Sequence, residues 1–270
     1  MNIVSFGGGT NSTAMIIGMH ERGIPIDLII FADTGGERPE TYAFIETLGE
    51  WLSGRGLPKI TTIQQTRHGE PETLESKCLR QNDMPSVAYG YGKCAVEFKI
   101  KPQERHCNNN ADCKAMWERG EKVNKYIGYD AGEQRRINKN QEKHDADKKY
   151  AYHFPLLEWG WSREECIDAI TRAGLPLPGK SSCFYCPNNK KAEIERLWKK
   201  HPDLFARAVA MERNVEKTRK DGTPSSIIGL GRTWTWESYK DAVDAQISLF
   251  DYIDEMGGCC CGMPCGCNDG

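Results

Sequence analysis

Three consecutive glycines after a short apolar segment near the start of the chain constrain the fold more than any other feature. The apolar residues 3–6 lead into Gly7-Gly8-Gly9, and a helical pattern opens at Thr10. Glycine adopts backbone conformations that other residues avoid, so successive N–H groups can converge on an anion at the positive end of the next helix. Ser12 and Thr13 can cap that helix and donate hydroxyl groups. The spacing is neither G-x-G-x-x-G nor a P-loop, which argues against dinucleotide and kinase-type sites.

A second unit of the same kind follows directly. The apolar residues 27–32 end in Asp33-Thr34-Gly35-Gly36-Glu37, and a further helical pattern starts near Pro39. Two strand-turn-helix units in succession predict a parallel sheet. Ligands of such sheets bind beyond the carboxyl ends of the strands, so residues 5–13 and 33–37 should face one crevice.

The remaining pattern predicts an α/β fold with a doubly wound, mostly parallel sheet and a helical carboxyl-terminal region. Expected helices cover 40–55, 73–80, 102–119, 162–173, 190–200, 204–219 and 236–256, and expected strands cover 60–63 and 123–129. The helix at Ser162 is predicted from a capping box with Glu165. Residues 131–149 are almost wholly polar, which predicts a flexible surface loop. We divide the chain into a nucleotide-binding domain (1–160), a helical region (161–256) and a mobile tail (257–270).

The charge, the hydropathy and the cysteine content of the chain indicate which classes of protein it resembles. The chain has 270 residues, with 36 Lys and Arg against 38 Asp and Glu, so its overall charge gives no case for nucleic acid binding. No apolar segment is long enough to span a membrane, no signal peptide is evident, and we expect a cytoplasmic protein. Twelve cysteines are many for a reducing compartment, where metal binding or redox chemistry is their natural use.

The spacing Cys183-x-x-Cys186 predicts half of a metal site, because two thiolates on one loop can hold a single ion. Cys78 and Cys94 are the best candidates for the other half. Four thiolates suit either a 4Fe–4S cluster or zinc, and the spacing does not decide between them. The alternative is that these cysteines are buried and bind nothing. The tail cysteines from Cys259 to Cys267 could complete a cluster, carry a persulfide or scavenge metal.

Further motifs carry a resemblance to a known family. They are Cys94-Ala95-Val96-Glu97-Phe98-Lys99-Ile100-Lys101-Pro102, Ile127-Gly128-Tyr129-Asp130 with Glu133, Arg135 and Arg136, Pro155-Leu156-Leu157-Glu158-Trp159 and Ser182-Cys183-Phe184-Tyr185-Cys186-Pro187. In this order, and with the glycine turn, they resemble the PP-loop ATP pyrophosphatases of the phosphoadenosine phosphosulfate (PAPS) reductase-like group. The chain departs from the family at Gly7, Thr10 and Asn11, where serine, lysine and aspartate are usual.

The resemblance implies an adenine nucleotide alpha hydrolase-like fold and a site for ATP or a related adenine nucleotide with Mg²⁺. The implied nucleotide-binding residues are Ser5, Phe6, Gly7, Gly8, Gly9, Thr10, Asn11, Ser12, Thr13, Phe31, Ala32, Asp33, Thr34 and Gly128. The implied catalytic residues are Asp33, Lys99, Arg135 and Arg136. In this interpretation Lys99 and the arginines replace the missing lysine, and Asp33 contacts magnesium. Alternatively, the site binds a nucleotide without cleaving it.

Three functions follow as hypotheses. The first is an adenylating enzyme that activates a substrate for sulfur transfer, with a 4Fe–4S cluster beside the nucleotide as in sulfur-handling relatives. The second is a reductase of PAPS or adenosine phosphosulfate, in which Cys265-Gly266 loosely resembles the catalytic motif. The third is a nucleotide-binding or metal-binding accessory protein without turnover. Partners that the first hypothesis allows are a tRNA, DNA or small-molecule acceptor, a sulfur-donor protein and a second copy of the chain.

Overall fold

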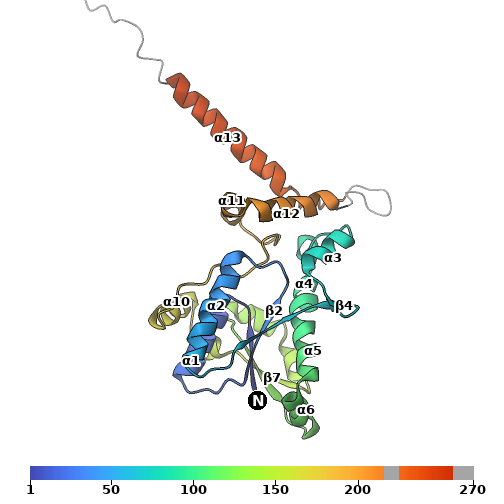
Figure 1. The fold of residues 1–270 in the computed structure, drawn as a ribbon, viewed down its shortest axis with the longest axis vertical. Coiled ribbons are helices and arrows are strands. Elements are labelled where there is room, and N and C mark those ends of the chain that lie inside the picture. The colour runs from blue at the N-terminus through green and yellow to red at the C-terminus, as the bar shows by residue number, and fades with distance from the viewer. Residues whose placement is uncertain (216–224, 258–270) are drawn as a thin grey trace, which may run out of the picture.

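Five parallel strands form the central sheet of the molecule (Figure 1). They are β1 (Asn2–Phe6), β2 (Leu28–Asp33), β3 (Ile60–Gln64), β6 (Val123–Ile127) and β7 (Tyr150–His153), in the order β3-β2-β1-β6-β7. The computed structural model describes residues 1–215 and 225–257, with 247–257 described by their backbone alone. From β1 the chain continues to β2 and then β3 on one side of β1. The later strands β6 and β7 are added on the other side of β1. The switch point therefore lies between β1 and β6, where ligands of such sheets bind.

Alternate residues of β1 face two different apolar cores, as the period of a strand requires. Val4 and Phe6 pack under α1 (Thr10–Glu21), α2 (Pro39–Ser53) and α10 (Arg163–Arg172). Ile3 points to the opposite face, in a smaller core with Cys107 and Cys113. Those two cysteines belong to α5 (Lys101–Asn109) and α6 (Ala111–Glu118). Helices thus cover both faces, and the doubly wound α/β fold is confirmed.

A third core joins two distant parts of the chain. Its first part is the segment after β3, which contains the hairpin of β4 (Thr66–Arg67) and β5 (Glu70–Pro71), then α3 (Leu74–Arg80), η1 (Ser86–Tyr89), α4 (Lys93–Ala95) and the π-helical turn η2 (Val96–Ile100). Its second part is the helical region with α11 (Lys191–Lys200), α12 (Pro202–Asn214) and the start of α13 (Trp236–Gly257). Leu74 and Phe98 pack in this core with Phe184 and Trp236. Beyond its first turns α13 projects away from the rest of the molecule (Figure 1).

Most expected elements are confirmed, two differ, and some observed elements were not expected. The expected helix 102–119 is two helices, because Asn110 is extended and caps α6 by accepting from the Cys113 N–H at 3.0 Å. The expected loop 131–149 contains η3 (Ala131–Glu133), α7 (Gln134–Asn138) and α8 (Gln141–Asp145), which start from a capping box of Asp130 and Glu133. Strand β7 and the short helix α9 (Pro155–Glu158) were not expected.

Two further expectations concern the carboxyl-terminal segments of the chain and the absence of a membrane-spanning helix. Part of the helix expected over 204–219 and the whole tail from residue 258 lie outside the described residues. None of the described helices combines the length and the apolar character that a membrane crossing needs.

Candidate functional site

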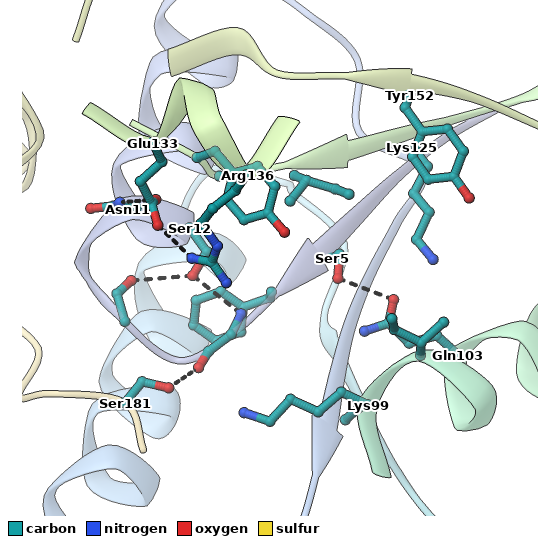
Figure 2. Close-up of a pocket in the computed structure, with 18 of the residues that line it drawn as sticks. Ser5, Asn11, Ser12, Lys99, Gln103, Lys125, Glu133, Arg136, Tyr152 and Ser181 are labelled. Atoms are coloured by element: carbon teal, nitrogen blue, oxygen red, sulfur yellow. Dashed lines mark hydrogen bonds and ion pairs between the residues drawn. The ribbon is translucent and has the colours of Figure 1, made fainter. Parts of the chain in front are cut away.

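A cavity of about 520 Å³ opens at the carboxyl ends of β1 and β6 (Figure 2). It therefore lies at the switch point of the sheet. The predicted residues that line it are Ser5, Phe6, Gly7, Gly9, Thr10, Asn11, Ser12, Ala32, Lys99, Gly128 and Arg136. The structure thus brings most of the predicted nucleotide-binding set and two predicted catalytic residues to one cavity.

The glycine turn presents free main-chain donors to this cavity. Gly8 has a φ of +75°, and a Cβ there would lie 2.9 Å from Thr41 Cγ2, so only glycine fits without strain. No side chain caps helix α1. Among the described residues, none accepts a hydrogen bond from the N–H groups of Gly8, Gly9 or Thr10. Unpaired N–H groups at a helix start carry partial positive charge and attract anions.

Two neighbouring segments hold the turn in place. A Cβ on Gly128 would lie 2.9 Å from the backbone of Ser12, so glycine lets the end of β6 touch the start of α1. On the other side, Ser181 Oγ donates a hydrogen bond to the carbonyl of Gly7 (Figure 2). The segment with Lys180 and Ser181 therefore forms the wall that faces the turn.

The lining of the cavity carries an excess of positive charge. Six of its residues are lysine or arginine (Lys99, Lys125, Arg136, Lys143, Arg163 and Lys180), and two are glutamate (Glu104 and Glu133). Lys99 Nζ lies 3.2 Å from Glu37 Oε1. Burial acts to lower the pKa of Lys99, but the Glu37 carboxylate outweighs it and the pKa is raised, so Lys99 stays protonated at neutral pH. This balance of charge suits a ligand with several negative charges.

Asn11 does not point freely into the cavity, because both ends of its amide are engaged. Its Nδ2 donates to Asp130 Oδ2 at 2.9 Å and to Glu133 Oε2 at 3.2 Å. Its Oδ1 accepts from Arg163 at 2.9 Å. Arg136 pairs in turn with Glu133. The residue that stands where the family has an aspartate therefore ties the start of α1 to two carboxylates.

Several predicted site residues lie elsewhere. Asp33 does not line the cavity: its Oδ1 accepts from Gly35 N at 2.8 Å and Tyr42 Oη at 2.9 Å, and its Oδ2 accepts from Gln64 at 3.1 Å. Thr34 contacts Cys183, and Arg135 is exposed outside the cavity. The remaining three, Gly8, Thr13 and Phe31, are not among the lining residues. The roles assigned to these residues stay predictions.

The four predicted metal-ligand cysteines gather beside the cavity. Cys78, Cys94 and Cys183 all pack in the third core, and Cys183 and Cys186 both influence the charge of Lys99. Burial raises the pKa of the Cys183 thiol to about 12, and Glu37 acts in the same direction. Burial likewise raises the pKa of Cys78 to about 12. These thiols are protonated at neutral pH, and a metal would have to displace their protons.

The chemistry of this cysteine group suits iron or zinc, since soft thiolate ligands favour both. However, the four thiols are not arranged as the ligands of one metal ion. Among the side chains of residues 1–215 and 225–246, no three His, Cys, Asp or Glu are arranged to hold a metal ion. Cys183 Sγ instead lies 3.1 Å from the Thr34 hydroxyl. Metal binding by these four cysteines remains a prediction.

Sequence reasoning missed several lining residues. They are Gln103, Glu104, Lys125, Tyr129, Lys143, His144, Tyr152, Arg163, Lys180 and Ser181. One of them had a readable signal, since Lys125 is a charged residue in the middle of an expected strand. Tyr152 comes from the unexpected strand β7, and the others come from helices and loops whose position relative to the sheet no local pattern reveals.

No protein-family model and no curated protein sequence matches this chain. Among solved structures, the fold is similar to the U34-tRNA thiolase NcsA from Methanococcus maripaludis, solved with its 4Fe–4S cluster. The two chains share 16% sequence identity, with a TM-score of 0.43 over 78% of this chain and 71% of the other.

Proposed function

We propose that this chain is a PP-loop-type enzyme that binds ATP or a related adenine nucleotide and adenylates a substrate for sulfur transfer. One observation carries the proposal: the uncapped start of α1 and the glycine turn face a cavity of about 520 Å³ whose lining carries six cationic residues. A nucleotide triphosphate combines the charge and the size that such a cavity takes.

In this proposal the N–H groups of residues 8–10 bind the phosphates, and the adenine lies near Ala32 and Gly128. Lys99 and Arg136 neutralise charge that develops on the phosphates. An oxygen of the acceptor attacks the α-phosphorus, and pyrophosphate leaves with the bonding electrons of the broken P–O bond. A sulfur nucleophile then displaces AMP from the activated acceptor. The chain contributes positioning and charge rather than a covalent residue.

The cysteine group is proposed to hold a metal centre through Cys78, Cys94, Cys183 and Cys186. A 4Fe–4S cluster there would bring sulfur chemistry next to the nucleotide, whereas zinc would brace the third core. Acceptors that the proposal includes are a tRNA, a DNA or a small molecule.

A second candidate is a protein that binds the nucleotide without cleaving it. The engaged amide of Asn11 and the enclosed carboxylate of Asp33 favour it, because both positions lack a free carboxylate for magnesium. Pyrophosphate release from ATP, measured with each class of acceptor, separates the two: release supports the enzyme, and tight binding without release supports the second candidate. The reductase hypothesis rests on Cys265, which lies outside the described residues.

Binding of ATP itself is tested by titration calorimetry on Gly8→Ala. We expect the dissociation constant to rise at least about tenfold, roughly 1.4 kcal/mol, because the new Cβ strains the turn that presents the N–H groups. Gly49→Ala is the matched control, since a Cβ at that helical position meets nothing within 4 Å. Equal affinity in Gly8→Ala, or no binding by the unmutated protein, would refute the proposed site.

A further inference from the structure

Lys125 is a buried lysine that the proposed nucleotide chemistry does not use. It lies in the middle of β6, paired with Ile3 of β1 and Tyr152 of β7. Only 6% of the residue is exposed, yet it lines the cavity. Figure 2 shows its ammonium group at the end of the cavity opposite Ser181, pointing toward Ser5 and Gln103. The cavity therefore has a second end, away from the wall that faces the glycine turn.

The ammonium group of Lys125 has three donors and nothing that accepts from them. No hydrogen bond or ion pair joins it to any other described residue. The ring centroid of Tyr150 lies 5.2 Å from Nζ, and Cys107 and Glu104 are close enough to influence its charge. Asp147 is close enough to influence its charge, but Asp147 already accepts from Tyr152 Oη at 2.9 Å and from the N–H of Lys149 at 2.8 Å. Burial lowers the pKa of Lys125, and Lys143 acts in the same direction.

Gln103 is a second buried polar residue in the cavity lining, and it too has an unpaired donor. It is 5% exposed and lines the cavity from α5. Its Oε1 accepts from Ser5 Oγ at 3.1 Å, which fixes the amide and leaves Nε2 without an acceptor among the described residues. Both donors are open to the cavity, but in Figure 2 the Oε1 of Gln103 lies on the side of Lys125 and Nε2 points toward the middle of the cavity. A buried charge without a partner lowers the stability of the folded protein. If position 125 served only to pack the core, an apolar residue of similar length such as methionine would stabilise the fold more.

We propose that the Lys125 end of the cavity is an anion subsite, which binds the carboxylate or phosphate group of a second ligand through Lys125 Nζ. This subsite is separate from the phosphate-binding turn and does not depend on nucleotide binding there. Glu104 and Asp147 lie near it, so the bound group is a single small anion rather than a chain of phosphates. In the proposed reaction this ligand is the acceptor, which makes the acceptor an acidic molecule or one that ends in a phosphate.

Nuclear magnetic resonance on the full chain with 13C-labelled lysine tests the subsite directly. The probes are inorganic phosphate and acetate, each titrated separately. We expect the Lys125 side-chain signal, identified by its loss in Lys125→Met, to shift saturably with one of them, and its titration midpoint to rise by at least about one pH unit. The better probe tells phosphate from carboxylate. Lys114, exposed on α6, is the internal control and should not shift saturably.

Stability supplies a second measurement. Lys125→Met should keep or raise the melting temperature and lose the anion response, whereas Lys114→Met should change neither. A melting temperature that falls in Lys125→Met, together with Lys125 and Lys114 signals that respond alike, would overturn the subsite and make Lys125 a structural residue. Should Lys125→Met not fold, Lys125→Arg identifies the signal instead, and the titration of the unmutated protein decides.

The Gly8→Ala variant distinguishes the anion subsite from the nucleotide site. If Gly8→Ala loses ATP binding but its Lys125 signal still responds to the anion, both proposals are supported. If the unmutated protein binds no ATP but Lys125 still responds, the proposed function fails and the anion subsite remains.

Discussion

At the scale of the residue, the neutral amide of Asn11 connects two carboxylates and a guanidinium by hydrogen bonds. Its Nδ2 lies between two carboxylates, and its Oδ1 accepts from a guanidinium. An aspartate at this position could not donate to Asp130 or Glu133, and it would place a third carboxylate beside them. The asparagine thus joins the start of α1 to η3 and α10 through its own hydrogen bonds.

We therefore expect Asn11→Asp to destabilise the protein by about 1–3 kcal/mol in the absence of divalent cations, because one donor is lost and like charges meet. Magnesium should recover part of this loss, since clustered carboxylates bind it. Thermal unfolding with and without magnesium measures both effects. Asn138→Asp is the control, because that exposed side chain only accepts, from Gln134 at 2.8 Å. An Asn11→Asp protein as stable as its parent without magnesium would contradict the bridging role.

At the scale of the element, Glu212 attaches the last helix to the rest of the helical region. This carboxylate of α12 is 2% exposed. Its Oε1 accepts from Leu230 N at 2.6 Å, and both its oxygens accept from Trp236 N at 3.0 Å. The start of α13 is therefore fixed by a buried acid. Burial raises the pKa of Glu212, and the backbone N–H groups oppose that effect only in part.

A raised pKa in the folded state fixes the sign of a pH effect. Above the ordinary glutamate value of 4.5, folded Glu212 binds more protons than unfolded Glu212. Its contribution to the unfolding free energy is therefore largest below that pH and is lost as pH rises through the folded pKa. We expect the stability of the parent relative to Glu212→Gln to fall with pH over this range.

Urea unfolding at a series of pH values measures this difference. Glu50→Gln, on the exposed face of α2, is the control. A stability difference between parent and Glu212→Gln that rises with pH would contradict the predicted sign.

At the scale of the whole molecule, the third core brings together cysteines that are far apart in the chain. Cys78 and Cys94 come from the segment after β3, and Cys183 and Cys186 come from the loop before α11. An ion pair of Arg207 with Glu75 fastens the same two parts, with Nε and Oε1 3.0 Å apart. A metal bound by all four thiols would cross-link these two segments and stabilise the folded state.

We expect protein prepared without oxygen to contain either iron with labile sulfide or zinc. The double variant Cys183→Ser, Cys186→Ser should lose this metal and should have a lower melting temperature. Metal analysis, visible absorption and thermal unfolding provide the measurements. Cys166→Ala is the control, because Cys166 is buried in the core under α10 and away from the cysteine group. Undiminished metal in the double serine variant would assign the metal to other cysteines, those of the tail included.

Local patterns were enough to predict the elements that carry the glycine turn. Glycine at position 8 and the apolar period of β1 depend on neighbours within a few residues, and so does the capping box at Ser162, where Glu165 accepts from the Ser162 N–H at 2.8 Å. The short helices of 131–145 were missed although their capping box is local, because the polar composition around it outweighed that signal. Strand β7 was missed because its pairing with β6, not its own sequence, makes it a strand.

The sequence by itself determined the parallel sheet, the glycine turn and the helix that follows it, because strand period and glycine conformation act over a few residues. The expected capping of that helix by Ser12 or Thr13 was wrong, since no side chain caps it. Only the tertiary structure decided which charged groups line the cavity. It enclosed Asp33, left Arg135 outside the cavity and brought Lys125 and Gln103 into its lining. These outcomes depend on how helices pack across the sheet, and that packing is set by contacts between residues far apart in the chain.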